Sequence, residues 1–403
     1  MFSKKKSNVV FSTDMHFPQS VKSSERVRRG CSKKLLLTGI NTRKPPDFRD
    51  FLTNGENKLQ LFSIIKSVWT SNEVASRLLN KVRIFIHEGI AFEISSSDGK
   101  SVSSEELVEL NSNQEETDYR QILYLFYAKH KGFKYAVVRT SDTDPLFIFL
   151  YYASQLHPLI IYLDTGTGKH RRLINVSELA DDLGASFCQT LLGFYIYTGE
   201  DANSAFRGKG KVLPLKKLMK TAKHQDTFKQ LGNNWDISDD LINRLEEFVC
   251  LIYGFPRTKN VNEVRSAMLK KMVGNKTEEL QKCKNIDLSK LPPCKRSHAP
   301  HCRRVNYRAA QFKNAHLNFP VTPHPQGHGW IPTNESASSN PNLQTNQHNI
   351  LEPVWSEGPI LPDRLIDLMT TDNHNVENDQ DEDDDNESDE SDMDSDGSDY
   401  DSE

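Results

Sequence analysis

An alternation of strand-like and helix-like segments between residues 135 and 184 constrains the fold most. The segments "YAVVRT" and "PLIIYL" have the length and apolar composition of buried strands. A helical pattern follows each of them, "DPLFIFLYYASQL" after the first and "NVSELADDLG" after the second. Parallel strands need a crossover connection, which is usually a helix. We therefore predict an α/β fold around a central, mostly parallel sheet.

Three further elements are expected upstream of this core. Apolar residues recur at roughly helical spacing within residues 55–80, which predicts a helix there. The segment "VRIFIHEGIAFEIS" predicts a hairpin that turns near Glu88 and Gly89. The segment "EETDYRQILYLFYAKHKG" predicts a helix that ends at Gly132.

The apolar segment at residues 145–163 has nearly the length of a membrane span. It contains Gln155, His157 and Pro158, and a proline at that place would break a spanning helix. We interpret the segment as a buried helix followed by a buried strand, and we expect no membrane partner. The N-terminus "MFSKKKSNVVF" lacks the apolar run of a signal peptide.

The six cysteines are spread widely and form no framework of close pairs. This pattern is typical of reduced thiols in a nuclear or cytoplasmic protein. The segment "CKRSHAPHC" offers Cys294, His298, His301 and Cys302 as zinc ligands, but their spacing matches no strong zinc pattern. We expect no zinc there.

The charges of this chain are unevenly distributed. Residues 372–403 contain 17 of the 55 acidic residues and no Lys or Arg, so the rest of the chain carries a formal charge of about +13. A basic body suits a polyanion such as DNA or RNA, although many basic proteins bind nothing specific. The acidic tail cannot bury enough apolar surface to fold. We expect it to be disordered and to bind basic proteins or the chain's own basic face.

Four acidic clusters could carry chemistry, and two of them follow predicted strands. The clusters are Glu115, Glu116 and Asp118; Asp142 and Asp144; Asp164; and Glu200 and Asp201. Function gathers beyond the carboxyl ends of parallel strands, and grouped carboxylates suit divalent cations that promote phosphodiester hydrolysis. Any single cluster is equally interpretable as a solvated helix start, where acids favour the macrodipole.

A basic, glycine-rich loop follows the last cluster. It consists of Arg207, Gly208, Lys209, Gly210 and Lys211. Such a loop can contact phosphates through its cations and its amides, or it can be a solvated turn.

The order of these motifs resembles the flap-endonuclease-like branch of the PIN-like nuclease family. That family has an acidic pair at a helix start, then D-x-D after a strand, then G-x-D before a G-x-G loop. More closely, the chain resembles an uncharacterised animal family of PIN-like proteins often suspected of mobile-element ancestry. Its hallmarks "EEADT", "RTxDTDV", "FGTGK" and "TGCDTxSxFxGKGK" correspond here to "EETDY", "RTSDTDP", "DTGTGK" and "TGEDANSAFRGKGK".

The resemblance implies a three-layer PIN-like fold and a nuclease for structured DNA or RNA that uses Mg²⁺ or Mn²⁺. The implied metal ligands are Glu116, Asp118, Asp142, Asp144 and Asp201, with Glu200 at a variable position. Lys22 and Arg29, two helical turns apart, would steady the scissile phosphate. The loop from Arg207 to Lys211 would hold the nucleic-acid backbone away from the cut.

The chain departs from the family at two places. The family's first strand carries another metal-binding Asp, which would precede Met1, and Ser12 stands where an acid should follow "VVF". Asp14 can take the place of that acid only if two residues are inserted after "VVF". These departures leave two alternatives open: a non-catalytic nucleic-acid-binding or protein-binding module, and a decayed mobile-element remnant.

These patterns divide the chain into four parts. We expect a basic N-terminal segment at residues 1–35 and a PIN-like domain at residues 36–285. Residues 286–371 form a Pro-, Asn- and Ser-rich extension with short ordered patches, and residues 372–403 are the acidic tail.

Overall fold

The computed structural model describes residues 8–17, 20–22, 24, 26, 30, 32–273, 287–333 and 350–357. All of them belong to one compact unit, Met1–Glu357. The predicted acidic tail and the predicted catalytic residue Arg29 lie outside the described residues.

The first sheet has four strands in chain order, β1 (Val9–Ser12), β2 (Val82–His87), β3 (Ile90–Ser95) and β4 (Ser103–Glu106). β1 is parallel to β2, and the other pairs are antiparallel. The predicted hairpin is confirmed. It turns at Glu88 and Gly89, which both have positive φ, as a tight two-residue hairpin turn requires. A Cβ on Gly89 would lie 2.3 Å from the carbonyl oxygen of Ser112, so only glycine fits.

Helical elements connect β1 to β2. They are α2 (Phe48–Phe51), α3 (Gly55–Trp69), the 3₁₀ turn η1 (Asn72–Val74) and α4 (Ala75–Leu78). Both α3 and α4 pack against the sheet. α3 confirms most of the helix expected within residues 55–80. Its Phe62 and Trp69 rings contact Phe11 of β1, which anchors the helix on the sheet.

The second sheet has three strands in the order β5 (Tyr135–Arg139), β6 (Ile160–Thr165) and β7 (Arg172–Asn175). β5 and β6 are parallel and are connected by α6 (Asp144–Leu156), while β7 is antiparallel to β6. The α/β class is therefore confirmed, but strands β1 to β7 divide into two mixed sheets rather than one mostly parallel sheet. The 3₁₀ turn η3 (Gly168–His170) precedes β7, and α7 (Val176–Leu183) follows it.

The prediction that "YAVVRT" forms a buried strand is wrong. β5 is an edge strand, and Tyr135 and Val137 are 54% and 50% exposed. An apolar run does not by itself distinguish a strand that is covered on one face from one that is covered on both.

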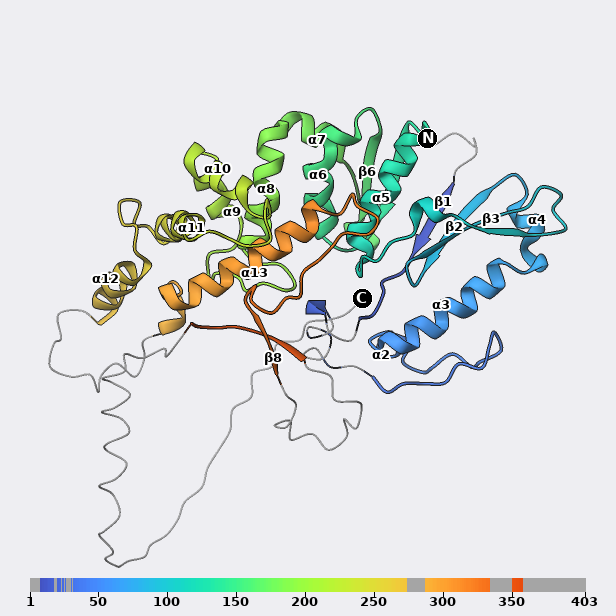
Figure 1. The fold of residues 1–403 in the computed structure, drawn as a ribbon, viewed down its shortest axis with the longest axis horizontal. Helices are drawn as coiled ribbons and strands as arrows, with labels where there is room; N and C mark the ends of the chain where they lie inside the picture. The colour runs from blue at the N-terminus through green and yellow to red at the C-terminus, as the bar shows by residue number, and fades with distance from the viewer. Residues whose placement is uncertain are drawn as a thin grey trace, which may run out of the picture. The chain divides into compact units, whose positions relative to one another are not determined.

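Helix α5 (Thr117–His130) follows the 3₁₀ turn η2 (Val108–Leu110) and packs between the two sheets (Figure 1). Its Leu123 and Tyr124 share a hydrophobic cluster with Ile84 and Ile86 of β2. Its Ile122 belongs to the larger core that the second sheet forms with the helices beyond it. The N-terminus of α5 thus lies where both sheets can supply side chains.

The C-terminal half is helical. Its elements are α8 (Ala185–Tyr197), α9 (Val212–Leu218), α10 (Ala222–Gln230), α11 (Asp239–Ile252), α12 (Val261–Val273), the 3₁₀ turn η5 (Leu288–Lys290) and α13 (Lys295–Lys313). A two-stranded sheet of β8 (Trp330–Thr333) and β9 (Ile350–Pro353) completes it. None of the described helices combines the length and apolar character that a membrane crossing requires.

Helix α13 changes the expected division of the chain. It packs on α8 and α11 (Figure 1), and Cys302, Val305, Ala309 and Phe312 lie fully buried in the main core. The described residues 287–333 and 350–357 therefore belong to the compact unit instead of forming an extension beyond residue 285. The composition of the segment favoured an exposed extension, because eight of the nineteen residues of α13 are Lys, Arg or His.

Candidate functional site

The end of β1 meets the start of α5. The Thr117 amide donates a 2.8 Å hydrogen bond to the Asp14 carboxylate, and the Met15 amide donates one of 2.8 Å to the Glu115 carbonyl. The Arg120 guanidinium of α5 donates to the Thr13 carbonyl. Asp14 therefore lies at the positive end of α5, which stabilises its negative charge.

Four aspartates gather at this point from three segments. Asp14 follows β1, Asp118 lies in the first turn of α5, Asp142 lies between β5 and α6, and Asp144 is the first residue of α6. Burial raises the pKa of Asp118 to about 8, and repulsion from Asp142, Glu116, Asp14 and Asp144 adds to that rise. Within the described part of the chain, no Lys, Arg or His forms an ion pair with Asp118, Asp142 or Asp144. We call Asp14, Asp118, Asp142 and Asp144 the aspartate cluster.

Asp144 is held by a tyrosine of α8. Tyr195 donates a 2.5 Å hydrogen bond to the Asp144 carboxylate, and its hydroxyl lies 2.9 Å from the Thr143 hydroxyl. Burial and the nearby Glu200 raise the pKa of Asp144 to about 6, although the Tyr195 hydrogen bond opposes the rise. The orientation of Asp144 is thus fixed by a side chain of α8.

Glu116 differs from its neighbours because cations surround it. Lys22 Nζ lies 3.0 Å and Arg308 Nη1 3.2 Å from its carboxylate oxygens, and the Tyr119 hydroxyl donates to it as well. Burial alone would raise the pKa of Glu116, but Arg308 and Lys22 outweigh it and lower that pKa to about 2. Lys22 also lies 3.6 Å from Asp201.

Arg308 joins Glu116 to Glu200. Its Nε lies 3.2 Å from the Glu200 carboxylate, which also accepts hydrogen bonds from the Ala202 amide and the Asn203 side chain. The Glu200 side chain is fully buried, whereas that of Asp201 is 39% exposed. Sequence reasoning expected only Asp201 to take part in the site, but Glu200 is the one that reaches its buried interior. We call Glu116, Glu200, Asp201, Lys22 and Arg308 the compensated group.

The expected metal ligands are therefore split between two environments. Asp118, Asp142 and Asp144 belong to the aspartate cluster, while Glu116 and Asp201 belong to the compensated group. In the described ranges, no three His, Cys, Asp or Glu side chains stand close enough to hold a metal ion as they are. The aspartate cluster nevertheless fits a divalent cation chemically. Its donors are hard oxygens, and the raised pKa of Asp118 reflects burial beside other carboxylates. Within the described residues Arg26 lies 3.8 Å from Asp14, whereas Asp118 forms no ion pair.

The basic loop lies before α9, and its side chains point in different directions. Arg207 is 70% exposed at its side chain and lies 3.7 Å from Asp287. Lys209 Nζ lies 4.0 Å above the Tyr253 ring. Gly208 and Gly210 both have positive φ and open space around them, so the backbone can be approached closely there.

Lys211 points inward, unlike Arg207. Its Nζ donates to the carbonyls of Tyr195 and Gly199 and to the Thr198 hydroxyl. These groups stand at the end of α8, so Lys211 caps that helix. Burial lowers the pKa of Lys211 to about 8, despite the opposing effect of Glu200 and Asp144. Its predicted contact with phosphate does not agree with this position.

The cysteine and histidine residues of α13 belong to the core. His298 Nε2 lies 2.7 Å from the Tyr197 hydroxyl and 3.3 Å from Cys302 Sγ, with His298 and Cys302 fully buried. Cys294 instead precedes the helix beside Ser297. The four residues of "CKRSHAPHC" therefore do not converge on one point.

Sequence reasoning missed several residues of the site. Asp14 had a signal, because it closely follows a strand, but the two extra residues after "VVF" argued against it. Tyr195 and Arg308 had no such signal in the sequence, since they lie inside helices among other apolar or basic residues.

No family model, curated protein or solved structure matches this chain at a significant level.

Proposed function

We propose that this chain hydrolyses phosphodiester bonds in DNA or RNA with a divalent cation. The observation that carries the proposal is the aspartate cluster, in which burial and mutual repulsion raise the pKa of Asp118 to about 8. Such a cluster is costly to the fold unless positive charge is added. Mg²⁺ and Mn²⁺ are the cations that carboxylate oxygens prefer.

Each side chain would have a distinct task. Asp118, Asp142 and Asp144 would hold the cation, and Asp14 would add charge from the end of β1. Tyr195 orients Asp144 through its hydrogen bond. A bound Mg²⁺ or Mn²⁺ supplies a water of lowered pKa and neutralises charge on the phosphate. Lys22 would contact the phosphate where the aspartate cluster and the compensated group meet. Its Nζ lies 3.6 Å from Asp201, which is a long contact for an ion pair.

The substrate class follows from charge. Outside its acidic tail the chain carries a formal charge of about +13, which favours a polyanion. The exposed Arg207 and the open glycine backbone beside it can add contacts to phosphates.

A second candidate function is a nucleic-acid-binding module without catalysis. It is favoured by the compensated group, where Lys22 and Arg308 already occupy the carboxylate of Glu116. A chain of this kind would bind nucleic acid with strong salt dependence and would leave it intact.

One experiment separates the two candidates. The full chain is incubated with labelled flap, hairpin and single-stranded DNA and RNA in Mg²⁺ or Mn²⁺, beside Asp144→Asn. Asp226→Asn serves as the matched control, because Asp226 is exposed and pairs only with the neighbouring Lys229 among described residues. Cleavage by the wild type and by Asp226→Asn, with loss in Asp144→Asn, supports hydrolysis. Binding without cleavage supports the module instead.

A further inference from the structure

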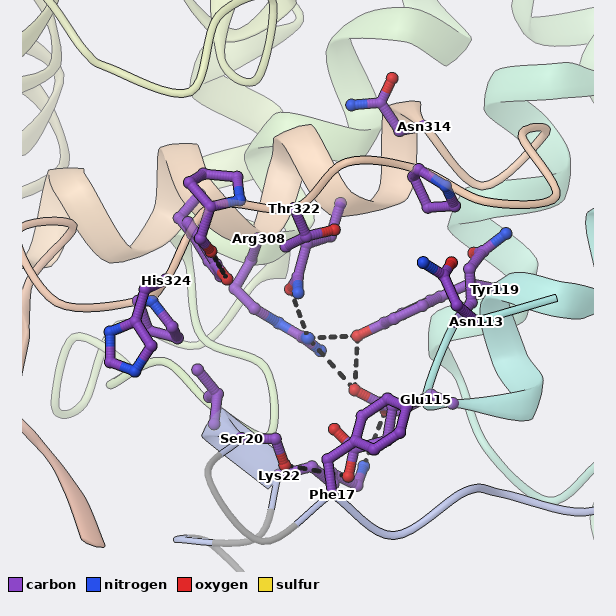
Figure 2. Close-up of a pocket in the computed structure, with 18 residues that line it drawn as sticks. Phe17, Ser20, Lys22, Asn113, Glu115, Tyr119, Arg308, Asn314, Thr322 and His324 are labelled. Carbon is purple, nitrogen blue, oxygen red and sulfur yellow. Dashed lines mark hydrogen bonds and ion pairs between the residues drawn. The ribbon is translucent and has the colours of Figure 1, made fainter. Parts of the chain in front are cut away.

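A cavity of about 390 Å³ borders the compensated group, and no task above uses it (Figure 2). Four segments line it: Phe17 with residues 20–22, residues 113–116 with Tyr119, one side of α13, and residues 320–325. Glu116 and Lys22 form part of its wall, so a group in the cavity lies beside the site proposed for the phosphate. Its volume is in the range of small-ligand pockets.

Amide side chains give the cavity hydrogen-bonding capacity. Gln114 Nε2 donates to the carbonyls of Ala315 and Leu317, and Gln311 Oε1 accepts from Arg308. None of the hydrogen bonds of the described residues uses Gln114 Oε1 or Gln311 Nε2. The cavity wall therefore keeps an acceptor and a donor, which together suit a ligand that carries both kinds of group.

Aromatic rings supply flat surfaces around these amides. Tyr119 and Tyr307 are buried, and the Tyr307 hydroxyl is fixed by a 2.8 Å hydrogen bond to the Pro323 carbonyl. Phe17 and His324 line the cavity but are exposed, so they stand where a ligand would enter. Tyr119 already packs on Phe312 and Tyr307 on Trp330, so the exposed Phe17 is the ring on which a planar ligand can stack.

The charges of the wall exclude an anion from the cavity itself. Glu115 is paired with Arg26 at 3.0 Å, and Glu116 with Lys22 and Arg308. Each of these cations contacts a carboxylate of the wall, so a phosphate placed inside the cavity would meet negative charge. Lys22 also lies 3.6 Å from Asp201, which does not line the cavity, so a phosphate can approach Lys22 from that side. A neutral polar ligand meets no such repulsion.

We propose that this cavity takes one unpaired nucleobase of the bound strand, while the strand's phosphate lies toward Lys22. A nucleobase is planar, neutral and carries both donors and acceptors on its edge, as the amides and rings require. The inference rests on the proposed nucleic-acid substrate and specifies that the strand must offer an unpaired base next to the site. Phe17 stacks on the base at the cavity mouth.

The test is a scan of short single-stranded oligonucleotides that each lack one base. Binding to the full chain is measured in Ca²⁺, beside Phe17→Ala and the control Phe319→Ala, which removes another exposed ring outside the cavity. The proposal predicts one position where loss of the base weakens binding roughly 5- to 150-fold, the range of a stacked base. In Phe17→Ala that penalty falls several-fold, and in Phe319→Ala it remains.

Two outcomes would overturn the cavity proposal: no position stands out, or Phe17→Ala weakens every oligonucleotide by the same factor. If the chain cleaves in Mg²⁺ but no base position affects binding, only the cavity proposal is wrong. If one base position affects binding but no cleavage occurs, only the proposed hydrolysis is wrong. If no oligonucleotide binds, both proposals are wrong.

Discussion

Arg308 Nη1 lies 3.2 Å from the Glu116 carboxylate, although 192 residues separate them, and neither side chain is more than 4% exposed. The ion pair fastens the last long helix to the N-terminus of α5. A buried pair of this kind is costly to break, because the remaining charge keeps no partner.

We therefore expect Arg308→Met to lower the free energy of unfolding by about 3–5 kcal/mol, since Glu116 and Glu200 would both lose a cation. Urea denaturation followed by fluorescence measures the change. Arg303→Met is the control, because Arg303 pairs with Glu357 at a more exposed place, and it should cost at most about 1 kcal/mol. Equal effects of the two substitutions would show that the buried pair contributes no more to stability than the exposed pair does.

The raised pKa of Asp118 predicts a pH dependence of stability. Its pKa of about 8 in the fold lies above its ordinary value near 4, so the native state binds this proton more tightly than the unfolded state does. Stability from this group is present below the unfolded pKa and is lost as the pH rises toward 8. Asp118→Asn should remove this loss, so between pH 5 and pH 8 it should gain about 3–4 kcal/mol of stability relative to the wild type. Denaturation curves at several pH values would contradict this if both proteins showed the same slope.

Cation binding should be coupled to proton release. At pH 7 Asp118 is largely protonated, and a cation at the aspartate cluster must displace that proton. Calorimetry with Mn²⁺ in two buffers of different ionisation enthalpy should show close to one proton released by the wild type and fewer by Asp118→Asn. Asp226→Asn should behave as the wild type. Binding of Mn²⁺ without proton release would place the cation elsewhere.

The basic loop provides a contrast between Lys211 and Arg207. Lys211→Met should destabilise the fold by about 1–3 kcal/mol, because the carbonyls of Tyr195 and Gly199 lose their donor. Arg207→Met should leave the melting temperature unchanged and reduce the salt dependence of nucleic-acid binding by roughly one phosphate contact. Melting curves and binding at several salt concentrations test both, and the reverse pattern would refute the assignment.

Local patterns in the sequence predicted most of the elements near the site. The hairpin at Glu88 and Gly89, the end of α5 near Gly132 and the pairing of β5 with β6 around α6 all follow from periodicity and turn chemistry. The acidic residues after predicted strands indicated one edge of the sheet. The resemblance to PIN-like nucleases then grouped Asp118, Asp142 and Asp144 with Glu116 and Asp201 as one set of metal ligands.

The electrostatics of the site could not be predicted in this way. Whether a carboxylate is compensated depends on contacts made across the whole chain, and Arg308 reaches Glu116 from a helix whose basic composition favoured a solvated extension. The division of the strands into two sheets was hidden for a similar reason, because hydrogen-bond partners of a strand are not written in its own sequence.

The central claim is that the aspartate cluster promotes phosphodiester hydrolysis. The most direct measurement is the single-turnover rate of cleavage of a labelled hairpin in Mg²⁺ by the wild type, by Asp142→Asn and by the control Asp226→Asn. Asp142 is exposed, so its substitution should not disturb the fold. We predict that Asp142→Asn loses at least about 100-fold in rate, as loss of a group that stabilises the transition state does, while Asp226→Asn keeps the rate of the wild type. Equal rates for all three proteins, or no cleavage by any of them, would contradict the account.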